Sequence, residues 1–535
     1  MDKSTLSETV TVSQGQLRGT RLPEAGAIAW LGVPYAKPPV GELRWKAPRD
    51  ADPWRGIRSA REYGPSSMQR GPEGILGSED CLYINLWRPD HEQSGLPVLV
   101  YLHGGGNIGG SGRDFQGAGL ARATNSIIVT VNYRLGVMGF FRHPALRTGD
   151  PLDDSGNYGL LDVIQALRWV QANIAAFGGD PGKVTLGGQS AGGRNALAAY
   201  LSPLGRGLFQ QLFILSGGMT TADCELGEAK ARVIVTDLAI KAGAAAAEAQ
   251  DWQSEQSAEV LAEWLYRQEA ADFVEAIPDT GLRMSAFPHL FEDGVVIPSG
   301  GFAALGDSGP PLPIVLGSTA TEFSGFALAA PRFATLAQGS DSPEEQQRRA
   351  YEAAVQYGSE LYAAFNVEEV AERFLRANPD MAIFGYRFSW GLRDGVTELH
   401  YRFLLGAAHG ADLPFYTGDF SEVMQSFPGA VITAANEPGR MALISCMRGY
   451  LRHFLHTGDP NGEALPPWTP WSGDRGTARI LRLDATAREA VVHMDKKLVR
   501  EDILARLEAD ERLQPDRLQG LRAELFAGRF FWTKR

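Results

Sequence analysis

The chain has 535 residues, 44% of them hydrophobic, and is therefore long enough to bury a large core in one large domain or in several. Its 63 acidic residues outnumber the 51 basic ones, and the resulting net charge of −12 argues against a nucleic-acid backbone or an anionic membrane as a partner. The 31 prolines and 62 glycines suit a loop-rich α/β enzyme better than a helical bundle or a coiled coil.

The N-terminal residues and the cysteines bear on the compartment. Residues 1–10 show neither an apolar leader core nor a small-residue cleavage site. No apolar run approaches the roughly 20 residues that span a bilayer. The three cysteines, Cys81, Cys224 and Cys446, form no C-x-x-C pair, so we expect buried free thiols rather than a disulfide framework, a zinc site or a redox pair. These features predict a cytoplasmic protein that contacts no membrane.

The first half of the chain alternates strand and helix patterns. Short apolar segments rich in β-branched residues predict buried strands at residues 97–102, 127–133, 184–186 and 213–215. Apolar residues at helical spacing predict a helix over 160–174, and an alanine-rich segment predicts another over 192–200. Strands that alternate with helices indicate a mostly parallel central sheet flanked by helices, hence the α/β class.

The rest of the chain continues this pattern with one interruption. Residues 244–247 are four alanines, which we expect to be helical. Further strands are predicted at residues 313–316 and 382–388, and the helical, polar stretch between them reads as an insertion over the sheet. A late helix should begin near Pro438 and end before Gly458.

The segment Gly188-Gln-Ser190-Ala-Gly192 lies between a predicted strand and a predicted helix. A bare G-x-S-x-G is weak evidence, but this context is the one in which it acts as a nucleophile elbow. A sharp strand-to-helix turn strains the serine, and only small neighbours relieve the crowding. The turn would present the Ser190 hydroxyl at a helix N-terminus, where N–H groups favour negative charge. The alternative is an ordinary glycine-rich turn.

A second glycine-rich segment, His103-Gly-Gly-Gly106, follows the strand that ends at Leu102. Consecutive glycines allow backbone N–H groups to turn toward one point. We therefore expect an oxyanion hole with donors from Gly105, Gly106 and Ala191. A phosphate-binding loop would require a following Lys-Ser or Lys-Thr, which is absent. His103 itself reads as structural support for this loop.

A serine nucleophile requires a base and a buried acid. Among nine histidines, His409 lies in a loop of small residues that leaves its ring room to reach a site, although a single histidine is more often structural. Glu322 follows a predicted strand end and is favoured by spacing, whereas Asp293, in an Asp-Gly pair, is the competing acid and is typical of a turn. The order Ser, acid, His is the one expected of α/β-hydrolases.

Several motifs together resemble the type-B carboxylesterase family, which includes bacterial p-nitrobenzyl esterases and cholinesterases. The resemblance covers nearly the whole chain and is carried by residues 30–41, 78–86, 132–136, 156–162, 173–181, 457–462 and 467–471. It implies the α/β-hydrolase fold, with Ser190 as nucleophile, Glu322 rather than Asp293 as acid, His409 as base, and Gly105, Gly106 and Ala191 as oxyanion donors. We accordingly expect residues 1–323 to form the first part of the catalytic core. Residues 324–378 should then form a helical insertion or cap, and residues 379–535 the second part of the core.

Three departures from the family pattern refine the expected substrate and compartment. Gln189 stands where relatives commonly have glutamate, which should weaken attraction for cationic substrates. The position expected to pair with Cys81 in secreted relatives, near Ser67 or Met68, holds no cysteine. In cholinesterases the loop that corresponds to the segment from Met68 to Cys81 carries a tryptophan that stacks on choline, and in fungal relatives it forms a lipase lid. Here the segment contains no tryptophan and is too short for a lid, which argues against a cholinesterase and an interfacial lipase.

The predicted function is therefore a serine carboxylesterase that hydrolyses esters of neutral, small to medium acyl or alcohol groups through an acyl-enzyme. The alternatives are an amide or carbamate hydrolase with the same triad and a non-catalytic binding protein of the same fold. No cofactor and no metal are expected, and the expected partner is a small-molecule ester. The sequence does not indicate an oligomeric state. Phe323 and Phe326, which follow the acid, either line an acyl pocket or pack in the core.

Overall fold

The structure is a computed structural model that describes residues 7–277, 287–307, 309–337, 345–471, 479–512 and 519–520. Contacts divide the chain into two compact units. The first unit comprises Met1–Gln210 and Met219–Pro310. The second comprises Gln211–Gly218 and Pro311–Arg535.

The first unit contains a mixed sheet whose strands run in the order β3 (Thr20–Leu22), β4 (Ala27–Pro34), β8 (Tyr83–Pro89), β10 (Ile127–Val131), β9 (Leu96–Leu102), β11 (Gly179–Gln189). The pairs formed by β10, β9 and β11 are parallel, and the pairs toward β3 are antiparallel. β9 and β10 are buried along their whole length. That is why they appear in the sequence as continuous apolar runs.

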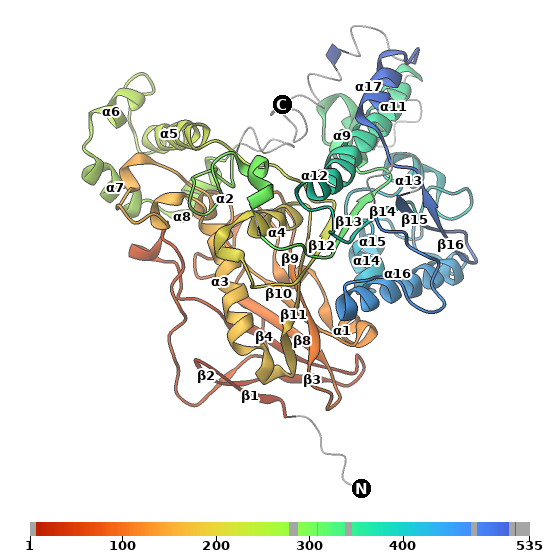
Figure 1. The fold of residues 1–535 in the computed structure, drawn as a ribbon. Helices are drawn as coiled ribbons and strands as arrows, with labels where there is room; N and C mark the ends of the chain where they lie inside the picture. Colours follow the sequence, from red (N-terminus) through yellow and green to blue (C-terminus); the bar gives the residue numbers. More distant parts are fainter. Residues whose placement is uncertain are drawn as a thin grey trace. The chain divides into compact units, whose positions relative to one another are not determined.

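Helices cover both faces of this sheet (Figure 1). α1 (Gly117–Thr124) packs against β4, β8 and β10, while α4 (Ala191–Leu201) packs against β9, β11 and α3 (Tyr158–Asn173). Two smaller sheets lie outside it, one formed by β1 (Thr9–Val12), β2 (Gly15–Arg18) and β5 (Ile57–Ser59), the other by the hairpin β6 (Gln69–Gly71) and β7 (Gly74–Leu76). α2 (Gly136–Gly139) and the helices α5 (Cys224–Lys241), α6 (Ala249–Glu255), α7 (Ala258–Arg267) and α8 (Ala270–Glu275) complete the helical part of the unit.

The second unit has parallel strands β12 (Gln211–Leu215), β13 (Ile314–Thr319), β14 (Ile383–Phe388) and β15 (Ile480–Ala485), and β16 (Ala490–Asp495) pairs with β15 antiparallel. α16 (Glu437–Thr457) packs against β15 and β16. Its proline lies in the first turn and its C-cap is Gly458, as the sequence predicted. The short helices α13 (Leu399–Leu404), α14 (Leu413–Thr417) and α15 (Ser421–Ser426) lie between β14 and α16 in the chain.

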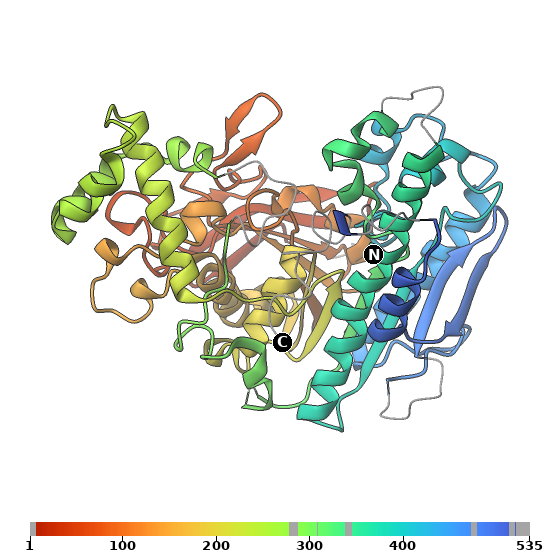
Figure 2. The same ribbon diagram turned by 90° about the horizontal axis from the view of Figure 1, so that it is seen from above.

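Residues 324–377 are largely helical where described. They form α9 (Ser324–Leu328), α10 (Ala334–Ala337), α11 (Glu345–Ala363), a π-helical turn (Ala364–Glu368) and α12 (Glu369–Ala377). α17 (Arg500–Glu508) lies alongside α11 (Figures 1 and 2). These helices share their own buried cluster, with side chains such as Phe323, Tyr351 and Ile503. The segment therefore has its own apolar core beside the strands of this unit.

The strand and helix positions predicted from apolar patterns are confirmed, with one error. The four alanines at 244–247 are not helical, because α5 ends at Lys241 and α6 begins only at Ala249. Gly243 adopts a φ of 106°, and the N–H of Ala244 donates to the Ala239 carbonyl at 3.0 Å. This is a helix-ending hydrogen bond around a left-handed glycine, and it outweighs the high helix propensity of alanine. Among the described residues no helix is both long and apolar enough to cross a membrane.

Candidate active site

Ser190 sits between β11 and α4 with φ 56° and ψ −120°, a strained conformation for a residue with a side chain. The flanking glycines make the turn possible. A Cβ on Gly188 would lie 2.5 Å from the Gly192 carbonyl carbon, and one on Gly192 would lie 2.0 Å from the Leu102 carbonyl oxygen. The backbone therefore presents the half-buried Ser190 at the N-terminus of a buried helix, as the G-x-S-x-G pattern predicted.

The loop after β9 lies against this turn. An ideal Cβ on Gly104 would be 3.1 Å from the Cβ of Ser190. Gly105 and Gly106 have φ values of 102° and 68°, which only glycine adopts freely. Within the described residues neither of their N–H groups donates to a protein acceptor. Ala191, at the first position of α4, is buried. These are the three positions predicted to supply oxyanion donors.

His103 supports its own loop, as predicted. Its Nδ1 lies 2.8 Å from the Gly104 carbonyl oxygen, and its ring stacks on Tyr133 at a centroid distance of 4.5 Å. Burial lowers the pKa of His103 to about 4, so the ring is neutral at physiological pH. The Tyr133 hydroxyl donates to the His103 carbonyl oxygen at 2.7 Å. His103 therefore holds the start of the glycine loop.

The second unit contains a buried acid paired with a histidine. Glu322 follows β13 and is fully buried, and His409 Nδ1 donates to its Oε2 at 2.5 Å. The other carboxylate oxygen, Oε1, accepts hydrogen bonds from the Thr319 N–H at 2.7 Å and from the Ser216 hydroxyl. Since His409 lies 87 residues further along the chain, the fold and not local sequence creates this pair.

The loops that carry the acid and the histidine are tied together. The Thr321 N–H donates to the Ala407 carbonyl at 3.1 Å, and the Thr321 hydroxyl donates to the Leu405 carbonyl at 2.7 Å. The His409 side chain is 16% exposed, and its ring lies 5.1 Å from that of Phe326. Phe326 therefore faces the histidine, whereas Phe323 is fully buried in the helical cluster. Of the two phenylalanines, only Phe326 remains a candidate for a substrate pocket.

Asp412 adds a second buried carboxyl to this unit. It accepts a hydrogen bond from the Tyr386 hydroxyl at 2.6 Å, and both side chains are fully buried. Burial, with a smaller contribution from the charge of Glu322, raises the pKa of Asp412 to about 6.

Asp293, the competing acid, lies in the first unit and closes a turn. Its carboxylate accepts hydrogen bonds from the N–H groups of Val296 and Ile297 at 3.0 and 2.9 Å and from the Asn157 side chain at 3.0 Å. The structural role expected of an Asp-Gly pair accounts for its position. Among the described residues no group of His, Cys, Asp and Glu side chains could hold a metal ion.

The carboxylesterase family model matches residues 6–342, more than half of the chain. The chain belongs to the carboxylesterase family. Accordingly, this carboxylesterase is a carboxylic ester hydrolase of the serine type. Its expected substrate is a small-molecule ester.

Curated relatives agree with the family model. The carboxylesterase is 29% identical over 533 residues to the medium-chain fatty acyl-CoA hydrolase precursor of Anas platyrhynchos, covering 91% of both chains. It is 30% identical to carboxylesterase 1C of Mus musculus, again over 91% of both chains. A higher identity, 40%, extends over 245 residues of the para-nitrobenzyl esterase of Bacillus subtilis, 44% of this chain and 48% of that one.

Solved structures establish the fold. A p-nitrobenzyl esterase structure superposes with a TM-score of 0.72 at 27% identity and covers 93% of this chain and 99% of the other. A carboxylesterase of Geobacillus stearothermophilus gives a TM-score of 0.70 at 28% identity, covering 91% and 98%. The carboxylesterase thus has the predicted α/β-hydrolase fold.

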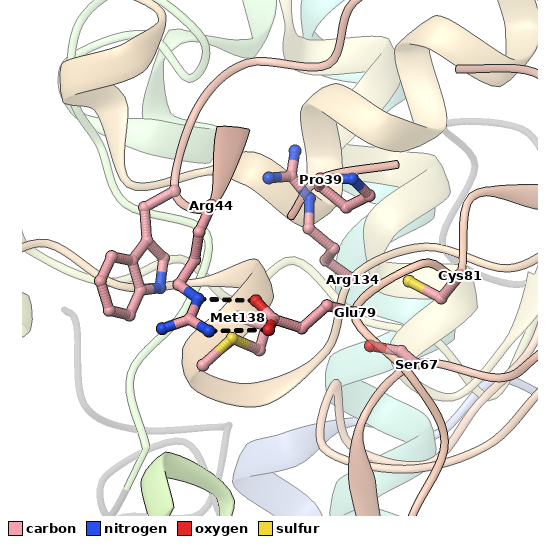
Figure 3. A pocket seen from close by; sticks show the side chains of 8 residues that line it. Pro39, Arg44, Ser67, Glu79, Cys81, Arg134 and Met138 are labelled. Carbon is pink, nitrogen blue, oxygen red and sulfur yellow. Dashed lines mark hydrogen bonds and ion pairs between the residues drawn. The ribbon is translucent and has the colours of Figure 1, made fainter. Parts of the chain in front are cut away.

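Motifs that carried the family resemblance form buried structure in the first unit. The Arg134 guanidinium makes two hydrogen bonds to Asp162, at 2.8 and 2.7 Å, with both side chains almost inaccessible. Nearby, Arg44 pairs with Glu79 at 2.6 and 2.7 Å (Figure 3). Removing one partner of such a buried pair typically costs about 3–5 kcal/mol, because the remaining charge stays buried. These residues preserve the fold rather than the chemistry.

The position expected to face Cys81 is also identified. The Ser67 side chain hydrogen-bonds the Cys81 thiol, and the two lie together in Figure 3. Burial raises the pKa of Cys81 to about 12, which keeps the thiol neutral. All three cysteines are free, although only Cys81 is fully buried, whereas Cys224 and Cys446 are partly exposed.

The sequence gives little indication of two side chains that hold Glu322 and the glycine loop after β9. Ser216 follows β12 directly, and a polar residue after a buried strand was the one available signal for it. Gln69, in the β6 strand, donates to the Gly110 carbonyl at 3.0 Å and accepts from the Gly110 N–H at 2.7 Å. Nothing in the sequence around Gln69 indicated this contact.

Proposed function

We propose that Ser190, His409 and Glu322 act as nucleophile, base and acid in ester hydrolysis. The observation that carries the proposal is the hydrogen bond from His409 Nδ1 to the buried Glu322 carboxylate. With Nδ1 donating to the acid, Nε2 is the basic nitrogen of the ring, which is the tautomer that a serine nucleophile requires. The strained Ser190 turn is the complementary feature of the first unit.

The proposed reaction is two-step acyl transfer. His409 takes the proton from Ser190 as the hydroxyl oxygen attacks the ester carbonyl, and the N–H groups of Gly105, Gly106 and Ala191 stabilise the oxyanion. Each donor would contribute about 3 kcal/mol to the transition state. His409 then protonates the leaving alcohol. Water attacks the acyl-enzyme with His409 again as the base, the bond between the acyl group and Ser190 breaks, and His409 returns the proton to Ser190 as the carboxylic acid leaves.

The test is the Ser190→Ala variant with a short p-nitrophenyl ester. We expect kcat to fall by about 10⁴- to 10⁶-fold while the melting temperature changes little. Covalent labelling by a fluorophosphonate should disappear as well, and it should require His409. Substantial turnover by Ser190→Ala would refute the triad, and an unlabelled wild-type protein would favour a non-catalytic role instead.

The proposed substrates are esters with neutral acyl and alcohol groups of small to medium size. Gln189 places a neutral amide directly before the nucleophile, and the segment after Met68 is a short hairpin rather than a long lid. Phe326 beside His409 offers an apolar surface. A series of p-nitrophenyl esters from C2 to C12, with a matched anilide, tests this range. Preference for the anilide would indicate an amidase instead.

We also propose a cytoplasmic location, a cap formed by residues 324–378, and no nucleic-acid or membrane partner. The three free cysteines and the serine that faces Cys81 support a reducing compartment. The cap proposal rests on α9, which begins two residues after the acid and carries Phe326 toward His409. Cell fractionation of the tagged protein tests the location. Recovery in the secreted fraction would contradict it.

A further inference from the structure

Two asparagines in the first unit join the oxyanion loop to the nucleophile helix. Asn107 directly follows Gly106, and Asn195 lies on α4, four residues after Ala191. Asn107 Nδ2 donates to Asn195 Oδ1 at 3.0 Å, and Asn195 Nδ2 donates to Asn107 Oδ1 at 2.8 Å. Both side chains are fully buried. The two amides therefore form a closed, reciprocal pair between the two elements that hold the proposed oxyanion donors.

The surroundings fix the orientation of both amides. The Tyr133 hydroxyl donates its proton to the His103 carbonyl and also hydrogen-bonds the Asn195 side chain. With its only proton used, that hydroxyl can only accept from Asn195, so the Asn195 NH₂ group must point toward it. The other proton of this NH₂ group then goes to Asn107. If the Asn195 amide were flipped, its Oδ1 would face the Tyr133 hydroxyl oxygen, and neither atom would have a proton to donate.

The backbone of Asn107 is held as firmly as its side chain. Asn107 has a φ of 59°, in the left-handed region that asparagine tolerates better than most residues. Its carbonyl accepts a hydrogen bond from the Gly136 N–H at 2.7 Å. Gly105 and Gly106, which precede it, have no side chains to anchor them. Asn107 is thus the first residue after the donors whose side chain can set their position.

We propose that the Asn107–Asn195 pair is a positioning device that sets the distance between the loop donors, Gly105 and Gly106, and the helix donor, Ala191. An oxyanion is stabilised only when its donors lie within about 2.7–3.1 Å of the oxygen. An apolar contact would fill the same space, but two hydrogen bonds define the separation and direction more narrowly. This inference rests on the proposed function of Ser190 and the glycine loop.

The principal variants are Asn107→Gly and Asn195→Leu. Asn107→Gly removes one amide while keeping a residue that accepts positive φ, and Asn195→Leu replaces the other by an apolar side chain of similar size. We expect each to lower kcat for p-nitrophenyl butyrate by about 10- to 100-fold, since a small displacement of catalytic groups costs this much. KM should change less than threefold. The double variant should lose little more than either single variant, because the pair acts as a unit.

Inhibition by a trifluoromethyl ketone distinguishes positioning from general damage. Its adduct with the serine places an oxyanion at the donors, so its KI should rise by about the same factor as kcat falls. Asn157→Leu is the matched control. Asn157 is an equally buried asparagine of the same unit that donates to the Phe291 carbonyl and to Asp293. It should lower the melting temperature without altering kcat or KI.

The variants distinguish a failure of the Asn107–Asn195 positioning role from a failure of the proposed triad. If Ser190→Ala is inactive while folded Asn107→Gly keeps kcat within threefold of the wild type, the positioning role is wrong and the triad stands. A lower kcat with an unchanged KI would also overturn it, because the loss would then lie outside the oxyanion donors. If Asn195→Leu does not fold, Asn107→Gly alone decides. An active Ser190→Ala would instead remove the proposed function.

Discussion

The two units hold their proposed catalytic groups in different ways. In the first unit, backbone conformation fixes their positions, since a strained turn positions Ser190 and glycines shape the proposed oxyanion loop. In the second, side chains from distant parts of the chain hold the Glu322–His409 pair, with the Ser216 hydroxyl on the acid and the Phe326 ring beside the base. Positions set by backbone geometry leave a local sequence motif, whereas positions set by side-chain contacts leave almost none.

The comparison predicts that the turn carrying Ser190 is intolerant of even one added methyl group at Gly192. In Gly192→Ala the new Cβ would lie 2.0 Å from the Leu102 carbonyl oxygen, a backbone atom that cannot move aside. We expect kcat to fall by more than about 10³-fold, or the protein not to fold, because the elbow and β9 cannot both keep their places. Activity assays and near-UV circular dichroism of the purified variant measure this.

A glycine-to-alanine substitution in the second unit provides the control. Gly325, in α9 and close to the acid, has open space where its Cβ would be placed. Gly325→Ala should keep kcat within twofold and leave the melting temperature unchanged or slightly higher. More than a tenth of wild-type kcat in Gly192→Ala would show that the elbow is less constrained than its contacts indicate.

In the second unit, we expect the contribution of Asp412 to the free energy of unfolding to depend on pH. A carboxyl pKa of about 6 in the folded protein, against about 3.9 in the unfolded chain, means that the folded state binds the proton more tightly. The stability that this bound proton adds to the folded state is fully present below about pH 4 and is lost as the pH rises through 6. Two pKa units correspond to about 3 kcal/mol. Asp412→Asn, which keeps an acceptor for Tyr386, should therefore gain up to that much stability relative to the wild type between pH 4 and pH 7.

Urea unfolding at several pH values tests this expectation. The matched control is Asp394→Asn, which removes a carboxylate that is 97% exposed and should not change the pH dependence. If the difference in unfolding free energy between Asp412→Asn and the wild type stays constant from pH 4 to pH 7, Asp412 does not titrate in this range.

A smaller effect is expected for Ser216, which hydrogen-bonds the acid. Ser216→Ala leaves Glu322 with the Thr319 N–H and His409, so the acid should orient the imidazole less well. We expect kcat to fall about tenfold with little change in KM, in line with the loss of one hydrogen bond to a charged group. Ser359→Ala serves as control, since that buried hydroxyl accepts from the Phe323 N–H and does not touch the acid. Equal losses in both variants would point to a general packing effect.

The sequence predicts the features that depend on local backbone geometry and fails to predict those that depend on contacts between distant side chains. The strands and α16 were predictable because their apolar spacing and their proline and glycine signals are local. Glu322 and His409 were indicated by order along the chain and by family resemblance. Ser216, which lies 106 residues before Glu322, could not be assigned to the acid, because no local pattern records a contact that only the folded sheet creates. The alanines at 244–247 show the converse, a local propensity outweighed by one glycine.

The smallest expected effect concerns Gln189, which directly precedes Ser190, the proposed nucleophile. Its Oε1 lies 2.4 Å from where a Cβ on Gly104 would stand, so its head group lies against the glycine loop. Gln189→Glu adds a negative charge there with almost no change in shape. Gln189 is buried, with 6% of its surface exposed, and at an effective dielectric constant of about 20 or more such a charge contributes on the order of 1 kcal/mol toward a cation.

We therefore expect the ratio of kcat/KM for acetylthiocholine to that for its uncharged analogue 3,3-dimethylbutyl thioacetate to rise about fivefold at low salt. The ratio should fall back as ionic strength increases, because salt screens the new charge. Gln116→Glu, with the same added charge at an exposed position, should leave it unchanged. If Gln189→Glu leaves the ratio unchanged while Ser190 still reacts with a fluorophosphonate, selection against cationic substrates lies elsewhere, and the first unit sets the position of the nucleophile without setting the charge preference.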